Sequence, residues 1–362
     1  MRDVEYMETA LMLARQAKGQ TSPNPLVGAV VVKDGRIVGM GAHLRAGEPH
    51  AEVHAIRMAG EKTVGSTVYV TLEPCSHHGR TPPCADLLIE SKVKRVVIAV
   101  KDPNPLVAGS GINRLKDAGI TVEIGVLQDE ARQLNKHFFH YVQTKTPFVT
   151  LKVAASLDGK TATSTGESKW ITGSEAREDV HHSRAEHDAI LVGVNTILKD
   201  DPSLTCRLEG ARRQPIRLIL DTHLRTPVSA RVVNDQCAPT WIITGNQVDG
   251  DRVELFHERG VKVITLPSET IKIDDLLTKL GLENITSLYV EGGSTVHDSF
   301  VNEKAFNEII TYFAPKLIGG KDTPAMIGGK GFLNMEDVLS LTISEIKQIG
   351  SDVKIVATPV KG

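Results

Sequence analysis

The chain has 362 residues, of which 41% are hydrophobic and 24% are charged, and its formal net charge is −2. These values exclude a disordered chain, and a near-neutral charge without any run of Lys and Arg argues against a surface built for nucleic acid. The acidic start of the chain lacks an apolar core, and no apolar run approaches membrane length, so we expect a cytoplasmic protein with no membrane partner.

A chain of this length predicts two domains, and its first part alternates helices and strands. Apolar spacing predicts a helix over residues 3–18, then a hairpin of strands 27–32 and 37–42 around Asp34-Gly35. Further helices start at His50 and at Cys84, and strands cover 67–72, 95–100 and 121–125, with a last helix at about 129–141. This order predicts a sheet with helices on both faces.

One group of residues in this part predicts a metal site: His50-Ala51-Glu52, Pro74-Cys75 and Pro83-Cys84. One imidazole and two thiolates are ligands that zinc favours, and three protein ligands leave the fourth tetrahedral position to water. Glu52 is close enough to His50 to reach that water without binding the metal. The pattern is typical of zinc-dependent nucleobase deaminases. It also argues against a disulfide framework among the four cysteines.

Two features near this pattern bear on the metal site: a second histidine, His54, and the long spacing between the cysteines. His54 follows His50 by one helical turn, but the His-Glu-x-x-His motif of proteases places the glutamate directly after the first histidine, so packing is the favoured role of His54. Eight residues separate Cys75 from Cys84, where two are common, so the segment between them must loop out. The role of Arg80 within that segment stays open.

The polar connection 144–147 places a domain boundary after residue 145. Beyond it, strands and helices alternate, which predicts a mixed sheet. Strands are predicted at 148–154, 189–192, 216–220, 240–244, 261–266, 287–290, 308–314 and 343–357, and helices at 174–186, 272–280 and 295–303.

A glycine pair, Gly292-Gly293, separates a strand from hydroxyl residues that open a helix. Glycines let the backbone approach a phosphate, and the free N–H groups of a helix start can bind it. Polar stretches at 165–172, 193–196 and 200–205 would lie along the same strand-end rim, where open α/β sheets place their ligands. We therefore expect a second ligand site in this domain.

Taken together, these motifs resemble the bifunctional riboflavin-biosynthesis deaminase-reductase family over essentially the whole chain. In the first half the resemblance rests on residues 73–77 followed by 79–84, with the long cysteine spacing. In the second half it rests on five short segments: 157–160, 168–170, 193–196, 201–205 and 291–293. It implies a cytidine-deaminase-like three-layer α/β/α domain over 1–145 and a dihydrofolate-reductase-like α/β domain over 146–362. It also implies zinc and NADPH as cofactors, a phosphorylated pyrimidine as the small-molecule substrate, and a homo-oligomer, either a dimer or a tetramer.

The resemblance also assigns roles to individual residues. In the deaminase half it implies zinc on His50, Cys75 and Cys84, Glu52 as the proton shuttle, and a pyrimidine held by Asn24, His43 and His77. In the reductase half it implies Lys152 as a catalytic residue beside the substrate; cofactor positions at Ala154, Trp170, Thr196, Asp200, Gly293, Ser294 and Thr295; and substrate positions at Ser168, Arg184, Leu204, Arg207 and Glu291.

Three of these positions can be judged from their side chains. Arg184 and Arg207 suit a sugar phosphate, which needs bidentate cationic partners. The less favoured alternatives are that Arg184 belongs to a solvated helix face and that Trp170 is core filling. Arg80 stands where the family pattern has lysine.

The expected function is a pair of consecutive reactions: removal of the ring amine of a diaminopyrimidinone ribosylamine phosphate, then hydride transfer from NADPH to the sugar C1. Two other functions would use the same metal motif. A nucleic-acid deaminase with an accessory domain would need a basic face for the polyanion. A zinc-stabilised structural module would not need Glu52.

Overall fold

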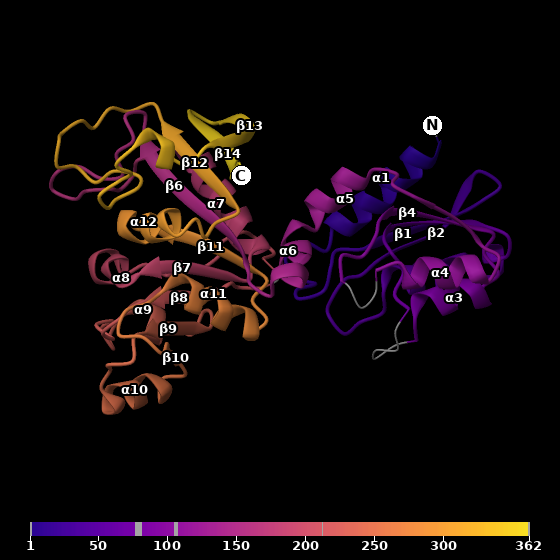
Figure 1. Cartoon of the computed structure of the whole chain (residues 1–362), viewed down its shortest axis with the longest axis horizontal. Helices are drawn as coiled ribbons and strands as arrows, with labels where there is room; N and C mark the ends of the chain where they lie inside the picture. The colour runs from indigo at the N-terminus through magenta and orange to yellow at the C-terminus, as the bar shows by residue number, and fades with distance from the viewer. Residues whose placement is uncertain (1, 77–81, 105–107, 212, 361–362) are drawn as a thin grey trace. The chain divides into compact units, whose positions relative to one another are not determined.

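The computed structural model describes residues 2–76, 82–104, 108–211 and 213–360. The chain divides into two compact units, Met1–Lys145 and Thr146–Gly362, and each has its own sheet (Figure 1). Among the described residues, no helix combines the length and the apolar content that crossing a bilayer requires.

The first unit is built on a five-stranded sheet with the order β2-β1-β3-β4-β5. Strand β1 pairs antiparallel with β2 and β3, whereas β3, β4 and β5 run parallel. The strands are β1 (Gly28–Lys33), β2 (Arg36–Ala42), β3 (Thr67–Leu72), β4 (Arg95–Val100) and β5 (Thr121–Ile124). The helices are α1 (Arg2–Arg15), α2 (Ala51–Ala59), α3 (Cys84–Glu90), α4 (Ser110–Asp117), α5 (Gln128–Leu134) and α6 (Lys136–Thr144), with a 3-10 turn at Gly60–Thr63.

Helices cover both faces of this sheet, because its central strands are apolar on both sides. In β1, Ala29 and Val31 pack with α2, α3 and α4, while Val30 and Val32 pack with α1, α5 and α6. Strands buried on both faces read as continuous apolar runs. The unit is therefore the predicted three-layer α/β/α domain.

The helix predicted at about 129–141 is two helices, α5 and α6, and the break between them lies at Asn135. The Asn135 side chain accepts a hydrogen bond from the Leu26 N–H (2.8 Å) and donates one to the Leu26 carbonyl oxygen (2.9 Å). An asparagine can replace a backbone partner in this way, and it does so here for a turn 109 residues earlier in the chain.

The second unit contains a nine-stranded sheet with the order β10-β9-β8-β7-β11-β6-β12-β14-β13. The strands are β6 (Phe148–Ser156), β7 (Ala189–Gly193), β8 (Ile216–Leu220), β9 (Thr240–Thr244), β10 (Lys262–Thr265), β11 (Ser287–Gly292), β12 (Glu308–Ala314), β13 (Leu341–Ile349) and β14 (Asp352–Pro359). The helices are α7 (Ser174–Glu186), α8 (Val194–Asp200), α9 (Arg231–Asn234), α10 (Gly250–His257), α11 (Ile273–Leu282) and α12 (Ser294–Asn302), with a 3-10 turn at Met335–Asp337.

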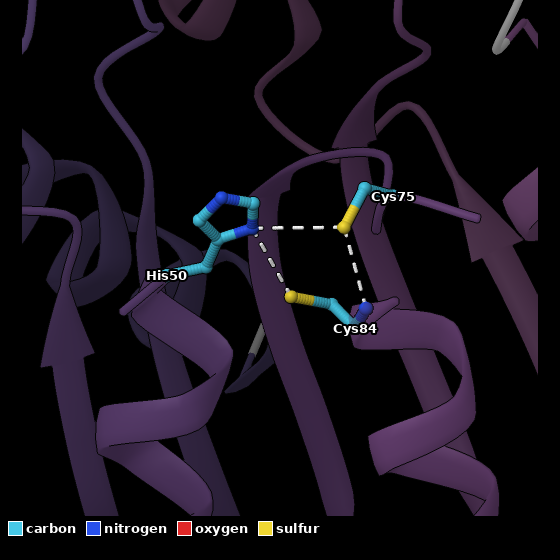
Figure 2. A group of neighbouring side chains, drawn as sticks. All are labelled: His50, Cys75 and Cys84. Carbon is cyan, nitrogen blue, oxygen red and sulfur yellow. Dashed lines mark hydrogen bonds between the residues drawn. The ribbon is translucent and has the colours of Figure 1, made fainter. Parts of the chain in front are cut away.

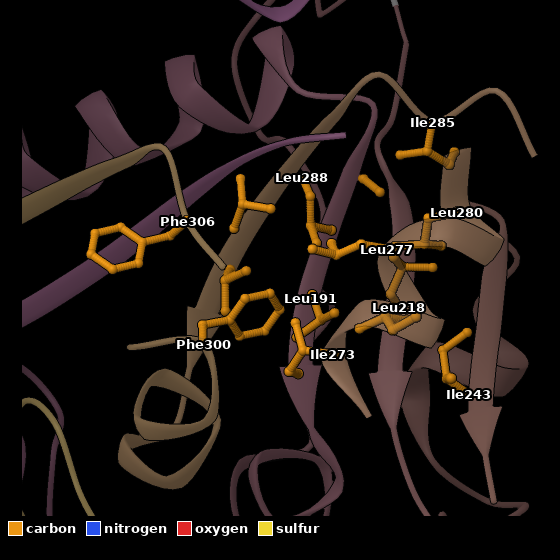
Figure 3. Packing of buried hydrophobic residues seen from close by; sticks show 14 of the residues in the cluster. Leu191, Leu218, Ile243, Ile273, Leu277, Leu280, Ile285, Leu288, Phe300 and Phe306 are labelled. Carbon is orange, nitrogen blue, oxygen red and sulfur yellow. The ribbon is translucent and has the colours of Figure 1, made fainter. Parts of the chain in front are cut away.

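One core of this unit lies between the parallel strands and the helices α11 and α12. Figure 3 shows Leu191, Leu218 and Leu288 of the strands facing Leu277 and Leu280 of α11. Burial of each such side chain contributes about 1.5–3 kcal/mol relative to exposure, which fixes α11 to the sheet. The opposite face is covered by α8, α9 and α10.

Two departures from the predicted elements concern this unit. The segment 343–357, predicted as a strand, is the antiparallel hairpin β13–β14, which turns at Gly350. Helices α8, α9 and α10 were not predicted, because each buries at most two apolar side chains and gives no helical periodicity.

Candidate metal centre and reductase site

Helix α2 carries two of the predicted deaminase residues, and it is positioned by glycines of β2. A Cβ atom on Gly39 would overlap the carbonyl oxygen of Ala55, and one on Gly41 would overlap that of Ala51. The helix backbone therefore lies directly on the strand, at a distance that no larger side chain would permit. His50 is the N-cap residue of this helix, and Glu52 lies in its first turn.

The structure brings His50, Cys75 and Cys84 together (Figure 2). Their ligand atoms all lie within 4.8 Å of one another. The Nδ1 atom of His50 is 3.6 Å from the Cys75 Sγ and 3.3 Å from the Cys84 Sγ. Cys75 follows the end of β3 and Cys84 is the first residue of α3, so all three ligands lie at strand or helix ends.

This arrangement fits a tetrahedral metal ion. Bonds of about 2.1 Å to nitrogen and about 2.3 Å to sulfur, at a tetrahedral angle, place the two atoms about 3.6 Å apart. The Cys75 sulfur also accepts a hydrogen bond from the backbone N–H of Cys84. A hydrogen bond from the Cys84 side chain, together with those from His50 and this N–H, outweighs burial and lowers the pKa of the Cys75 thiol to about 4. The thiolate is the form that binds metal.

Glu52 is only 3% exposed. Burial, reinforced by the nearby Cys75, raises the pKa of its carboxyl group to about 7. Such a group can both accept and release a proton at neutral pH. His54 is half-buried one helical turn after His50, where its Cβ lies against Gly41, and it is not part of the three-ligand group.

Two of the three residues predicted to hold the pyrimidine also come together. The Nδ1 atom of His43 is 3.2 Å from the Pro49 carbonyl oxygen, so this nitrogen carries the hydrogen. Its Nε2 atom then accepts a hydrogen bond from the Asn24 amide (3.1 Å). Burial lowers the pKa of His43, which agrees with the neutral ring. His77 and Arg80 lie outside the described residues.

In the second unit, Arg184 and Glu291 form a buried ion pair. The Arg184 Nε and Nη2 atoms donate to the two Glu291 oxygens at 2.6 and 2.8 Å, and Nη1 donates to the Thr205 carbonyl oxygen. Their side chains are 13% and 10% exposed, so Arg184 is not on a solvated helix face. Lys152 lies near the pair, and burial lowers the pKa of its amine while Glu291 opposes that shift.

His181 belongs to this group, although no sequence motif predicted it. Its two ring nitrogens lie 3.3 Å from the backbone nitrogen and the Nε of Arg207. Burial, with Arg184 and Arg207 nearby, lowers its pKa to about 4, so the ring is neutral and accepts at one nitrogen. The available signal was its spacing: His181 precedes Arg184 by three residues, which places both on one face of α7.

Two other residues predicted to bind the substrate, Leu204 and Ser168, form no part of this polar group. The side chain of Leu204 is buried in the core beneath α8, so only its backbone could reach a ligand. Ser168 is half-buried in the segment before Trp170.

Two parts of the predicted cofactor site are adjacent. Thr196 Oγ1 would lie 3.9 Å from a Cβ on Gly293, the N-cap residue of α12, so the starts of α8 and α12 meet there. Ser294 and Thr295 form the first turn of α12, and the Ser294 carbonyl oxygen accepts from the Gly328 N–H. The free N–H groups of such a turn suit a phosphate.

The remaining predicted cofactor residues have other surroundings. Trp170 is 61% exposed and stacks against the Arg177 guanidinium, so it is not core filling. Ala154 lies in β6 opposite Tyr312, and Asp200 is the half-buried last residue of α8.

Two family models match the chain, one in each unit. Residues 1–100 match the cytidine and deoxycytidylate deaminase zinc-binding region, and residues 147–355 match the RibD C-terminal domain. The fold and the metal centre thus define a two-domain enzyme, a zinc-binding deaminase followed by a reductase.

Similar proteins extend over the full chain. The riboflavin biosynthesis protein RibD of Bacillus amyloliquefaciens is 56% identical over 99% of this chain and 96% of its own length. The RibD of Escherichia coli strain K12 is 44% identical, with 98% of each chain covered. The structure of a RibD from Acinetobacter baumannii superposes with a TM-score of 0.91 at 40% identity, with 99% of each chain covered.

A Thermotoga maritima structure has a TM-score of 0.88 at 37% identity, with 99% of each chain covered. That protein is described as a diaminohydroxyphosphoribosylaminopyrimidine deaminase/5-amino-6-(5-phosphoribosylamino)uracil reductase. The present chain belongs to the RibD family of riboflavin biosynthesis proteins. It is a bifunctional deaminase and reductase with zinc and NADPH as its cofactors, which confirms the predicted fold class, family and pair of activities.

Proposed function

We propose that residues 1–145 remove the ring amine of 2,5-diamino-6-ribosylamino-4(3H)-pyrimidinone 5′-phosphate, and that residues 146–362 then reduce the ribosyl group of the product to ribityl. The observation that carries this proposal is the meeting of His50, Cys75 and Cys84 beside the buried Glu52. The description of the Thermotoga maritima relative supports the choice of substrate.

When bound, zinc supplies a water acidic enough to attack near neutral pH, and NADPH supplies a hydride. In the deaminase unit, Glu52 takes the proton of the attacking water and passes it to the amine on the ring carbon. The carbon–nitrogen bond breaks, so the ring gains a carbonyl group and ammonia leaves. The Asn24 amide, oriented by His43, contacts the polar edge of the ring.

In the reductase unit, reduction at the sugar C1 would break the bond from C1 to the ring oxygen, and that oxygen would take a proton. Lys152 donates the proton, because its amine lies beside the ion pair and its lowered pKa eases release. Arg207, whose Nε lies on His181, binds the sugar phosphate, while Arg184 is engaged by Glu291 and fixes the shape of the site. The first turn of α12 and Thr196 bind the cofactor phosphate.

The proposal includes a cytoplasmic homo-oligomer. Strand β13 is the edge of the nine-stranded sheet, and Ile343 and Ile346 are 54% and 66% exposed on it. Apolar side chains on an edge strand, which has a neighbouring strand on one side only, favour association with a second copy. Light scattering on the purified protein measures the number of copies.

One pair of variants tests the assignment of both sites. Glu52→Gln should retain zinc but release ammonia at least about 100-fold more slowly, since general acid–base groups contribute factors of that order. It should still oxidise NADPH when given the deaminated intermediate. Lys152→Met should behave in the opposite way, with normal ammonia release and slow NADPH oxidation. Full deamination by Glu52→Gln would exclude Glu52 as the proton carrier.

A further inference from the structure

Glu73 lies directly after β3, and its carboxylate accepts hydrogen bonds from four backbone N–H groups. Oε2 accepts from Asp102 (3.3 Å) and Gly109 (3.1 Å), and Oε1 accepts from Gly111 (3.1 Å) and Ile112 (3.2 Å). The side chain is only 4% exposed. Within the part of the chain that the structure describes, no Lys, Arg or His forms an ion pair with it, so the peptide N–H groups alone compensate its burial.

These four donors belong to the connection between β4 and α4 and to the first residues of α4. Gly111 and Ile112 lie in the first turn of this eight-residue helix. A negatively charged side chain is favourable at that position, and hydrogen bonds to a charged acceptor are stronger than neutral ones. One side chain thus fastens the start of α4 to the end of β3.

The start of α4 also contacts the residues on either side of Cys75. A Cβ on Gly111 would overlap the carbonyl oxygen of Pro74, so backbone meets backbone at this point. The Ser110 and Ser76 hydroxyl groups are 2.6 Å apart. Pro74 and Ser76 flank Cys75, whose sulfur lies 3.6 Å from His50 Nδ1. Cys75 therefore lies on a stretch of chain that is held on both sides by the start of α4.

We propose that Glu73 is a positioning residue for the metal centre. By holding the start of α4 against Pro74 and Ser76, it fixes the direction of the Cys75 sulfur towards His50 and Cys84. The proposal rests on Cys75 as a metal ligand. Residues that orient metal ligands from outside typically change metal affinity by about 10–100-fold when they are replaced.

The test compares Glu73→Gln with Glu130→Gln, an exposed glutamate of α5 in the same unit. The glutamine keeps the size of the side chain but points an NH₂ group at two N–H donors. Each protein is loaded with cobalt(II) in place of zinc, and three properties are measured: the absorption bands of the cobalt centre, the rate of metal release to a chelator, and amide hydrogen exchange over residues 108–115. Glu73→Gln should shift the bands, release metal at least about tenfold faster and exchange these amides faster, while Glu130→Gln should match the wild type.

A second variant disturbs the same contact from the other side. Gly111→Ala leaves Glu73 intact but forces Pro74 away, so it should change the cobalt bands in the same direction and also speed metal release. Unchanged exchange over α1 and β1 in both variants shows that the unit has folded.

Two results would overturn the proposal. If the amides of 108–115 exchange faster in Glu73→Gln while the cobalt bands and the release rate stay as in the wild type, Glu73 secures α4 and not the metal centre. If Cys75→Ser holds the metal as tightly as the wild type, the ligand assignment itself is wrong; that result is separate from the outcome of the Glu52→Gln experiment.

Discussion

The ion pair of Arg184 and Glu291 makes the stability of the reductase unit depend on pH. Burial alone would raise the pKa of Glu291, but Arg184 and, more weakly, Lys152 outweigh it and lower the pKa to about 2 from an ordinary value near 4.5. A carboxyl group whose pKa is lower in the folded state stabilises the fold at pH values above its unfolded pKa. This contribution is lost as the pH falls from about 4.5 towards 2.

We therefore expect the unfolding temperature of the second unit to fall between pH 5 and pH 3. The double variant Arg184→Met/Glu291→Leu, which removes both charges, should show a smaller fall. Both tryptophans of the chain, Trp170 and Trp241, lie in this unit, so tryptophan fluorescence reports its unfolding alone. An equally steep fall in the double variant would assign the acid sensitivity to other carboxylates.

Asn135 gives a prediction for the deaminase unit. Asn135→Ala removes both hydrogen bonds to Leu26 and frees the turn that carries Asn24. The two lost bonds are together worth about 2 kcal/mol, a factor of about 30, so we expect the KM of deamination to rise by up to about 30-fold with a smaller change in kcat. Zinc content and NADPH oxidation should not change. Asn135→Asp keeps only the acceptor, so its KM should lie between those of the wild type and Asn135→Ala. An unchanged KM in Asn135→Ala would show that Asn135 does not position Asn24.

The metal centre could be predicted at the scale of residues because its chemistry requires particular residue types. The pattern of His50, Cys75 and Cys84 identified the nitrogen and the two sulfurs, and Glu52 followed from its spacing to His50. Asn135, Glu73 and His181 could not be predicted in the same way. They act through hydrogen bonds to backbone or to another side chain, and such partners are set by the fold and not by local sequence.

At the scale of elements, the packing of α2 on β2 sets the position of the metal centre. Gly41→Val would drive side-chain atoms into the Ala51 carbonyl oxygen, and overpacking of this kind costs about 1–3 kcal/mol. We expect a lower unfolding temperature of the first unit, a lower zinc content and weaker deamination, with NADPH oxidation unchanged. Met40→Val is the matched control, because Met40 is exposed on the other face of the same strand.

The strands of the first unit were predicted closely, since buried strands are continuous apolar runs with turn residues at both ends. The start of α2 at His50 and of α3 at Cys84 also agreed with the sequence. The break between α5 and α6 was missed because the bonds of Asn135 to Leu26 depend on tertiary structure. The β13–β14 hairpin was missed because its turn at Gly350 lies between strands of similar composition.

At the scale of the whole molecule, each unit has its own sheet and its own hydrophobic cores, so the two activities should respond separately to metal removal. Dialysis against a chelator should abolish deamination and lower the unfolding temperature of the first unit, because a bound ion stabilises only the folded state. NADPH oxidation with the deaminated intermediate should stay within about twofold, since the metal ligands all lie in the first unit. Recovery of ammonia release on adding zinc is the control, and a parallel loss of both activities would show that the units depend on each other.

The glycine face of β2 has a consequence for the mutational tolerance of this enzyme. In a saturation screen for growth without added riboflavin, positions 39 and 41 should reject almost every substitution, although neither glycine has a side chain to offer to a substrate. The positions that tolerate no substitution would thus include the contact between β2 and α2 as well as the catalytic residues. Libraries meant to alter substrate choice should leave these two codons untouched.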